Sequence, residues 1–290
     1  MHKAGFVNII GNPNVGKSTL MNALVGERLS IITSKAQTTR HRILGVVSGE
    51  DFQIVFSDTP GILKPSYKLQ ESMMKFVTGA VNDADVILYV TDTVEQSDRS
   101  NDILEKIRQS DIPTLAVINK IDLTTPEKLE ELVDKWQAAA TIVPVSAREN
   151  FNIKGLFDLI LERLPEGEAF YSKDTLTDKT LRFFASEIIR EKILRNYDKE
   201  IPYCCEIAIE AYKEEPTIDR IAATIYVARD SQKGILIGHK GEKLKRVGQA
   251  AREDMEQFLG KKVFLQLFVK VNDDWRNNER QLRRFGYELE

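Results

Sequence analysis

The N-terminal region contains the sequence Gly11-Asn12-Pro13-Asn14-Val15-Gly16-Lys17-Ser18, which fits the pattern G-x-x-x-x-G-K-[ST]. The apolar residues 6–10 before it predict a buried strand, and residues 19–25 after it predict a helix. In this setting the glycines let successive backbone N–H groups curl toward phosphate oxygens, and the helix N-terminus adds further N–H donors. We therefore predict a phosphate-binding loop, in which Lys17 reaches the β- and γ-phosphates and the Ser18 hydroxyl binds Mg²⁺.

Strands and helices alternate through the first part of the chain. We predict strands at 4–10, 42–48, 52–57, 86–90, 114–118 and 141–145, and helices at 17–25, 69–82, 98–109, 126–138 and 153–164. Only a short turn separates the second strand from the third, so this pair is antiparallel, whereas longer connections join the other strands. The first domain, residues 1–165, is therefore predicted to be α/β, with a six-stranded, mostly parallel sheet and helices on both faces.

The third predicted strand is followed directly by Asp58-Thr59-Pro60-Gly61. In sheets of this kind, ligands bind at the carboxyl ends of the strands, where the phosphate loop also lies. The Asp58 carboxylate is predicted to act on Mg²⁺ through a water molecule, and the backbone N–H of Gly61 to contact the γ-phosphate. The polar segment 27–41 contains Thr38 and Thr39. A hydroxyl from either one can bind Mg²⁺ only while the γ-phosphate holds this segment in place, which makes the segment a switch.

We assign the choice of base to Asn119-Lys120-Ile121-Asp122, which follows the strand predicted at 114–118. An ionised Asp122 carboxylate only accepts hydrogen bonds, so it suits the N1–H and N2–H₂ donors of guanine, whereas adenine has a lone pair at N1. Asn119 can donate toward the guanine edge and tie neighbouring loops together, and the stem of Lys120 can cover the base. The pair Ser146-Ala147 can offer backbone N–H groups to guanine O6. The predicted ligand is therefore GTP or GDP and not ATP.

The residues quoted above resemble the signature loops of the translation-factor-related GTPases, and the resemblance covers residues 1–165. It implies hydrolysis of GTP to GDP and phosphate, with Lys17, Thr39 and Gly61 in catalytic roles. Analogy with related T-T-R segments favours Thr39 over Thr38 as the Mg²⁺ ligand. The predicted GTP-binding residues are Gly11, Asn12, Pro13, Asn14, Val15, Gly16, Lys17, Ser18, Thr19, Asp58, Thr59, Pro60, Gly61, Ile62, Asn119, Lys120, Ile121, Asp122, Ser146 and Ala147.

One position departs from the Ras-type GTPases, which place a glutamine immediately after D-x-x-G to orient the attacking water. Here that position is Ile62, whose aliphatic side chain cannot orient or deprotonate water. Either hydrolysis is slow without a partner, or another group positions the water. Relatives with a hydrophobic residue at this position often use a bound K⁺, and Asn14 stands where they have a K⁺ ligand. The alternative is that Asn14 only shapes the turn.

A second domain is predicted over residues 180–290, after a polar linker at 166–179. Its predicted order is helix, two strands, a glycine turn, a helix, a strand and a C-terminal helix, which resembles the α+β KH domain of the prokaryotic type. The sequence Gly238-His239-Lys240-Gly241 fits the G-x-x-G loop with which KH domains clamp about four nucleotides of RNA. The predicted RNA-binding residues are Gly234, Gly238, His239, Lys240, Gly241, Lys243, Lys245 and Arg246.

A GTPase domain followed by a KH domain resembles the Era family of bacterial GTPases over the whole chain. This resemblance implies binding near the 3′ end of 16S ribosomal RNA (rRNA) and action during maturation of the 30S ribosomal subunit. It also implies peripheral association with the inner membrane. The alternative is a GTPase switch whose second domain binds a protein partner, with its basic face merely solvated.

Composition sets the remaining expectations. Hydrophobic residues make up 42% of the chain and the net charge is −3, which is typical of a soluble globular protein. The adjacent Cys204 and Cys205 lack metal-ligand spacing and are expected to be reduced, as in the cytosol. No apolar run reaches the roughly 18 residues of a membrane span, and the N-terminus has no signal-peptide pattern. We therefore expect a cytoplasmic monomer.

Overall fold

The computed structural model describes residues 1–94, 105–107, 109–136 and 141–287. The chain divides into two compact units, of which the first contains residues 1–66 and 73–178 and the second contains residues 67–72 and 179–290. Most of the helix predicted at 98–109 lies outside the described residues. None of the helices in the described ranges is long and apolar enough to cross a membrane.

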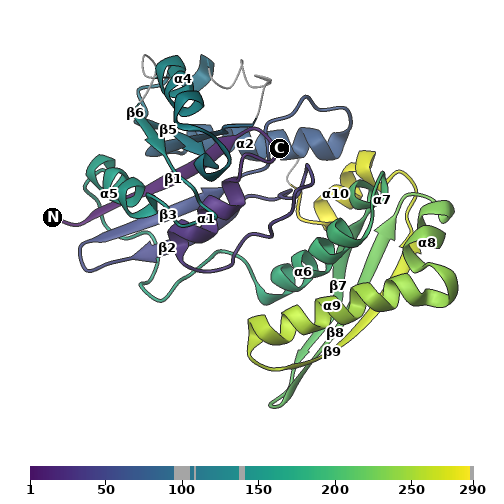
Figure 1. The fold of residues 1–290 in the computed structure, drawn as a ribbon. Coiled ribbons are helices and arrows are strands. Elements are labelled where there is room, and N and C mark those ends of the chain that lie inside the picture. Colours follow the sequence, from purple (N-terminus) through teal and green to yellow (C-terminus); the bar gives the residue numbers. More distant parts are fainter. Residues whose placement is uncertain (95–104, 108, 137–140, 288–290) are drawn as a thin grey trace. The chain divides into compact units, whose positions relative to one another are not determined.

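The first unit contains a six-stranded sheet in the order β2-β3-β1-β4-β5-β6, in which only β2 is antiparallel to its neighbour. Its strands are β1 (Lys3–Gly11), β2 (Ile43–Ser48), β3 (Phe52–Asp58), β4 (Val86–Asp92), β5 (Thr114–Asn119) and β6 (Thr141–Pro144). The described helices are α1 (Lys17–Val25), α2 (Lys68–Asn82), α4 (Pro126–Trp136) and α5 (Ile153–Arg163). Figure 1 shows helices on both faces of this sheet, so the predicted α/β fold is confirmed.

The central strands are apolar along most of their length because helices cover both faces of the sheet. Val7 and Ile9 of β1 and Leu88 of β4 have no exposed surface at all. Parallel pairing also aligns the strand ends. In the register of the sheet, Ile9 pairs with Asp58, and Asp92 pairs with Asn119. The loops that carry the candidate site residues therefore leave the sheet along one edge.

Residues 166–178, most of the predicted linker, belong to the first unit. Val46 of the edge strand β2 donates its backbone N–H to the Leu176 carbonyl at 2.8 Å, and the Thr177 hydroxyl donates to the Leu44 carbonyl at 2.6 Å. Earlier in the same segment, the Tyr171 carbonyl accepts a hydrogen bond from the Gln53 side-chain amide at 2.9 Å. The polar composition of this segment suggested a free linker, but its polar groups serve the backbone of β2 and the side chain of Gln53.

The second unit is α+β, and its three-stranded sheet has the order β7-β8-β9. Strand β7 is antiparallel to β8, and β9 is parallel to β8. The elements are α6 (Leu181–Asn196), α7 (Ile201–Cys204), β7 (Glu206–Glu214), β8 (Ile218–Val227), α8 (Asp230–Ile237), α9 (Glu242–Leu259), β9 (Lys262–Val271) and α10 (Glu279–Arg284). The predicted order of main helices and strands is confirmed, and the core contains the buried Ile189, Ile225, Val247 and Met255.

Two local features of this unit were not predicted from the sequence. The expected glycine turn is replaced by α8, in which Leu236 is fully buried and the Gln232 side chain accepts a hydrogen bond from the Ala228 backbone. The predicted C-terminal helix is short, because the Asn278 side chain caps α10 by accepting from Gln281 N at 3.1 Å. In α8 the burial of Leu236, and in α10 the Asn278 cap, decided the structure against the local propensity of the residues.

Candidate functional site

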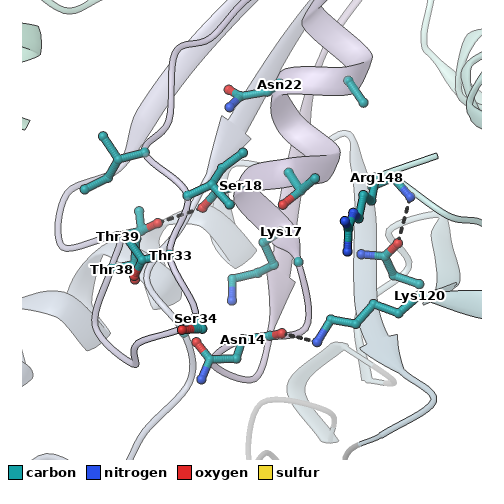
Figure 2. Close-up of a pocket in the computed structure, with 18 of the residues that line it drawn as sticks. Asn14, Lys17, Ser18, Asn22, Thr33, Ser34, Thr38, Thr39, Lys120 and Arg148 are labelled. Carbon is teal, nitrogen blue, oxygen red and sulfur yellow. Dashed lines mark hydrogen bonds between the residues drawn. The ribbon is translucent and has the colours of Figure 1, made fainter. Parts of the chain in front are cut away.

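A pocket of about 1140 Å³ opens at the edge of the sheet in the first unit (Figure 2). Figure 2 shows Lys17 and Ser18 at the start of α1, Thr39 beside Ser18, and Lys120 reaching toward Asn14. The predicted GTP-binding residues that line the pocket are Pro13, Asn14, Gly16, Lys17, Ser18, Thr19, Gly61, Asn119, Lys120, Asp122 and Ala147, and Thr39 joins them. Several residues of the loops 11–18 and 119–122, and one residue from each of the loops 58–61 and 146–147, therefore meet around one cavity.

The phosphate loop owes its shape to Gly16, which has a φ of 92°. A Cβ atom at Gly16 would lie 2.3 Å from the side-chain nitrogen of Asn119, so only glycine fits here. Asn14 also has a left-handed backbone, with a φ of 66°, a conformation that asparagine tolerates better than most residues. The ammonium group of Lys17 is buried and donates to the Asn12 carbonyl at 2.8 Å, which holds it inside the loop.

Three side-chain oxygens converge behind the loop. The Ser18 hydroxyl donates to Asp58 Oδ2 at 2.7 Å, and the Thr39 hydroxyl lies 2.9 Å from Ser18 Oγ and 3.3 Å from Asp58 Oδ2. The neighbouring Thr38 hydroxyl instead contacts Thr33 Oγ1 at 2.6 Å and the Lys35 carbonyl at 2.5 Å. Of the two threonines that the sequence left open, Thr39 is therefore the one that faces Ser18 and Asp58.

Burial raises the pKa of the Asp58 carboxyl, and the nearby positive charge of Lys17 opposes this rise. A carboxyl group in such a position gains stability in its ionised form from a bound cation. The oxygens of Ser18, Thr39 and Asp58 are the ligand type that Mg²⁺ prefers. The side chains of Ser18, Thr39 and Asp58 therefore fit the predicted magnesium ion.

The opposite end of the pocket is built around Asn119, which is buried and joins two loops. Its amide donates to the Val15 carbonyl at 2.9 Å, and its side-chain oxygen accepts from the Ala147 backbone N–H at 3.0 Å. The Asp122 carboxylate accepts from the Ser146 hydroxyl at 2.6 Å, which fixes its orientation. These contacts hold the acceptor that would read guanine at a fixed distance from the phosphate loop.

In the second unit, the predicted G-x-x-G loop lies between α8 and α9. Gly238 and Gly241 have φ values of 74° and 82°, which allow the chain to turn sharply before the N-terminus of α9. His239 and Lys240 are exposed at the tip, as are Lys243, Lys245 and Arg246 on α9. Gly234 does not belong to this loop, because it lies within α8.

A groove of about 560 Å³ runs beside this loop, between α9 and the edge strand β9. Its lining combines apolar and polar side chains from both elements: Gly241, Leu244, Lys245, Gly248, Gln249, Arg252, Leu265 and Leu267. Sequence reasoning identified only Gly241 and Lys245 in this set. The others carry no motif of their own, because they come together only when β9 pairs beside β8.

Two protein-family models match the chain. One, described as 50S ribosome-binding GTPase, matches residues 6–120, and the other, described as KH domain, matches residues 200–276. GTPase Era from Staphylococcus haemolyticus is 45% identical over 99% of this chain and 97% of the relative. GTPase Era from Alkaliphilus metalliredigens is 46% identical over 99% of both chains. The chain belongs to the Era family of GTPases.

Solved structures of Era proteins agree with this membership. One, a crystal structure of Era in complex with MgGDPNP and nucleotides 1506–1542 of 16S ribosomal RNA, has a TM-score of 0.94 and 41% identity and covers 100% of both chains. Another, a single-residue variant of Aquifex aeolicus Era bound to GDP·AlF₄⁻, has a TM-score of 0.93 and 40% identity and covers 99% of this chain and 100% of that chain. This Era-family chain is thus a GTPase with a P-loop domain and a C-terminal KH domain.

Sequence reasoning passed over residues that line the Era-family pocket and one that contacts a lining residue. Asp92, at the end of β4, is buried and forms an ion pair with Lys120 at 2.5 Å, which holds the lysine across the pocket. Its position at a strand end was the signal that could have revealed it. Thr33, Lys35 and Gln37, from the polar segment 27–41, also line the pocket. Further lining residues include Asn22, Arg28, Leu123, Arg148 and Asn150.

Some predicted GTP-binding residues do not line the pocket of this Era-family chain. Thr59 is buried and donates to the Ile9 carbonyl at 2.7 Å, and Ile62 packs into a hydrophobic cluster with Val77 and Tyr89. The Ile62 side chain is therefore part of the core, while its backbone N–H donates to the Gly11 carbonyl. The other residues outside the lining are Gly11, Asn12, Val15, Asp58, Pro60, Ile121 and Ser146.

Proposed function

We propose that this GTPase is a nucleotide-dependent switch that binds 16S rRNA near its 3′ end and acts in maturation of the 30S ribosomal subunit. The observation that carries the proposal is the placement of the Thr39 hydroxyl, 2.9 Å from Ser18 Oγ. Thr39 belongs to a loop segment, so its contact with the site can depend on the γ-phosphate. The RNA assignment is supported by the Era structure with nucleotides 1506–1542 of 16S rRNA, which is 41% identical to this chain.

In the proposed site, fixed groups surround the β- and γ-phosphates. Lys17 offsets negative charge on these phosphates, and the backbone N–H of Gly61 donates to the γ-phosphate. Donors that are already oriented stabilise the charge that develops as the phosphoryl group transfers, because they need no rearrangement. The aliphatic Ile62 has no polar atom with which to orient the attacking water. We therefore expect slow hydrolysis in the absence of a partner.

Ser18, Thr39 and Asp58 are the residues that would hold Mg²⁺, with Asp58 acting through a water molecule. When bound, the metal neutralises charge on the phosphate oxygens. The Ser18 hydroxyl donates to Asp58 Oδ2 at 2.7 Å, and this hydrogen bond holds the two oxygens next to each other. These two side chains are therefore already in position for the metal. Thr39 is the remaining member, and its loop position lets it report the presence of the γ-phosphate.

Guanine is recognised in this proposal by the Asp122 carboxylate, which Ser146 orients. The backbone N–H groups of Ser146 and Ala147, which were predicted to face guanine O6, donate instead to the Phe151 carbonyl and to Asn119 Oδ1. Lys120 covers the base with its stem while Asp92 and the Asn14 carbonyl hold its ammonium group, each at 2.5 Å. An adenine nucleotide would place the lone pair of its N1 against the Asp122 carboxylate, so this acceptor would be left unpaired.

The RNA part of the proposal uses the loop Gly238–Gly241 and the groove beside α9. Glycines allow phosphates to approach the backbone closely, and the N-terminus of α9 supplies N–H donors to them. The exposed basic residues on the loop and helix add attraction that is independent of sequence. Leu265 and Leu267 offer an apolar wall against which bases can rest.

The test is to titrate RNA of nucleotides 1506–1542 against the full chain loaded with GDP or with a GTP analogue, at one stated salt concentration. We expect tighter binding in the GTP-analogue form, and by linkage the RNA should tighten GTP binding by the same factor. Changing His239 and Lys240 to Asp should weaken RNA binding at least about tenfold and leave GTP hydrolysis without RNA intact. Equal affinity in both nucleotide states would contradict the switch.

We also infer three finer properties from the Era-family resemblance. They are use of K⁺ at Asn14, a monomeric state, and a cytoplasmic location with peripheral contact to the inner membrane. The use of K⁺ is supported by the position of Asn14, which lines the pocket. Sedimentation and fractionation of cells would test the other two.

A further inference from the structure

Strand β9 lies at an edge of the second unit's sheet and presents different side chains on its two faces. Val263, Leu265 and Leu267 pack toward the core of the unit. The alternate residues are all exposed: Lys262, Phe264, Gln266, Phe268 and Lys270. Phe264 is 43% exposed and Phe268 is 51% exposed, so two large aromatic rings lie on a face where polar residues are the rule.

The neighbouring strand β8 adds a cation and leaves room around the rings. Phe264 pairs with Arg220, whose guanidinium lies 5.4 Å from the ring centroid. Gln266 lies between the two rings along β9 and pairs with Ala222, which pairs in turn with Ala211 of β7, so the side chains beside Gln266 are small. Four residues along a strand separate the rings by about 13 Å. We call Arg220, Phe264, Gln266, Phe268 and Lys270 the β9 outer face.

Positive charge surrounds the β9 outer face. Among the described residues, the cations on or beside it are Lys213, Arg220, Lys262, Lys270 and Arg284, and the carboxylates that form ion pairs with them are Glu210, Glu215 and Glu256 of α9, which lies 3.2 Å from Lys262. Glu215 contacts both Lys213 and Arg220, and Glu210 lies 3.9 Å from Arg284. The cations therefore outnumber the carboxylates, and such a surface attracts a polyanion.

Helix α10 bounds this face at one end. Phe285 lies 5.4 Å from the Tyr226 ring, and the Arg284 guanidinium lies 5.9 Å from the same ring. Tyr226 pairs with Lys270 in the sheet, so α10 packs over the end of the face that carries Lys270. Phe264 and Phe268 stay exposed beyond it, while Trp275 and Leu282 of the same C-terminal segment are buried.

We propose that the β9 outer face stacks unpaired bases of single-stranded RNA, as a second contact beyond the groove at α9. The inference rests on the proposed RNA-binding function. Every base has a π-face, so exposed Phe rings and a ring-stacked Arg bind single strands with little dependence on sequence. A protein partner is disfavoured, because interface cores are depleted of Lys and need contiguous apolar surface, whereas here an amide separates the two rings.

The groove and the β9 outer face are the two sides of one strand. Leu265 and Leu267 line the groove, and Phe264, Gln266 and Phe268 alternate with them on the other side. Since β9 is an edge strand, an RNA that leaves the groove reaches the outer face by crossing a single strand. The proposal therefore requires RNA longer than the roughly four nucleotides that a G-x-x-G loop clamps.

The experiment compares 4-nucleotide and 12-nucleotide single-stranded RNAs cut from the 3′ end of the 1506–1542 segment, bound to the full chain. Phe264→Ala with Phe268→Ala should weaken binding of the 12-nucleotide RNA about five- to a hundredfold and leave the 4-nucleotide RNA within about twofold. The matched control is Phe258→Ala, which removes another exposed ring of the same unit, on α9. It should change neither affinity.

A second pair of variants separates stacking from loss of apolar surface. Phe268→Tyr keeps the ring and should bind the 12-nucleotide RNA normally, whereas Phe268→Leu keeps apolar area and should weaken it. GTP hydrolysis without RNA reports that each variant is folded. Suppose the double Phe variant binds the 12-nucleotide RNA as the wild type does, while changing His239 and Lys240 to Asp still abolishes binding. This result would overturn the inference about the β9 outer face and leave the proposed RNA-binding function intact. If the wild-type chain binds neither RNA, both the inference about the β9 outer face and the proposed RNA-binding function are wrong.

Discussion

The nucleotide pocket and the RNA-facing loop solve two recognition problems in opposite ways. At the nucleotide pocket, the polar side chains that hold the loops together are buried and hydrogen-bonded. Asn119, which is only 2% exposed, joins two loops, and Asp58, which has no exposed surface, accepts from Ser18. Around the G-x-x-G loop, His239, Lys240 and Lys245 are all exposed. Buried networks are strong but fail when one member is lost, whereas exposed charges each contribute little and add together.

The difference follows from what each region must distinguish. Guanine and adenine differ by a few hydrogen-bonding groups, so discrimination needs a rigid acceptor, and Asp122 is oriented by Ser146 at 2.6 Å. RNA phosphates are alike in every sequence, so an exposed cationic surface is enough to attract them. Single substitutions should therefore have large effects in the pocket and small ones on the surface.

The largest expected effect is at Asp122, where Asp122→Asn replaces an acceptor oxygen by a donor. GTP affinity should fall at least about a hundredfold, and preference should move toward xanthine nucleotides, which have a carbonyl where guanine has an amino group. Competition between GTP and XTP for the purified chain measures this. The matched control is Asp92→Asn, which loosens Lys120 and should weaken both nucleotides alike. Unchanged discrimination in the Asp122 variant would show that another group reads the base.

A smaller effect is expected at Thr39, because its loop reaches the Mg²⁺ ligands through this hydroxyl. Thr39→Val removes the contact with Ser18 and Asp58, so GTP hydrolysis should fall about tenfold or more, while GDP affinity stays within about twofold. Thr38→Val is the control, since the Thr38 hydroxyl faces Thr33 and Lys35 instead. Single-turnover measurements give the rate of GTP hydrolysis, and titration with GDP gives the affinity, for each of the two variants. The reverse ranking of the two variants would assign the role to Thr38.

The same contrast explains what the sequence could predict. The pocket requires particular atoms at fixed spacing along strand ends, so Gly11–Ser18, Asp58–Gly61 and Asn119–Asp122 were recognisable, and the six-stranded sheet followed from the alternation of elements. Asp92 was missed because its partner Lys120 is distant in sequence and no motif links them. The choice between Thr38 and Thr39 also needed geometry, because adjacent residues share the same sequence signal.

In the second unit the sequence located the G-x-x-G loop but not the groove. Leu265 and Leu267 look like ordinary strand residues, and they line the groove only because β9 pairs in parallel with β8. Helix α8 was missed because the glycines around this segment favoured a turn, while the burial of Leu236 and the hydrogen bond between Gln232 and Ala228 stabilise a helix. Surface recognition depends on tertiary neighbours, which periodicity along one segment does not reveal.

The smallest effect concerns Asn14, which lines the pocket and has a left-handed backbone, with a φ of 66°. If its side chain binds K⁺, hydrolysis should be about three- to tenfold faster in K⁺ than in Na⁺ at matched ionic strength, because a cation near the phosphoryl group offsets developing charge. Asn14→Gly keeps the left-handed turn and removes the side chain, so it should abolish the difference between the salts while nucleotide binding persists. If Asn14 only shapes the turn, the wild-type chain will hydrolyse GTP equally fast in both salts. A salt difference that survives in Asn14→Gly would move the K⁺ site to other atoms of the loop.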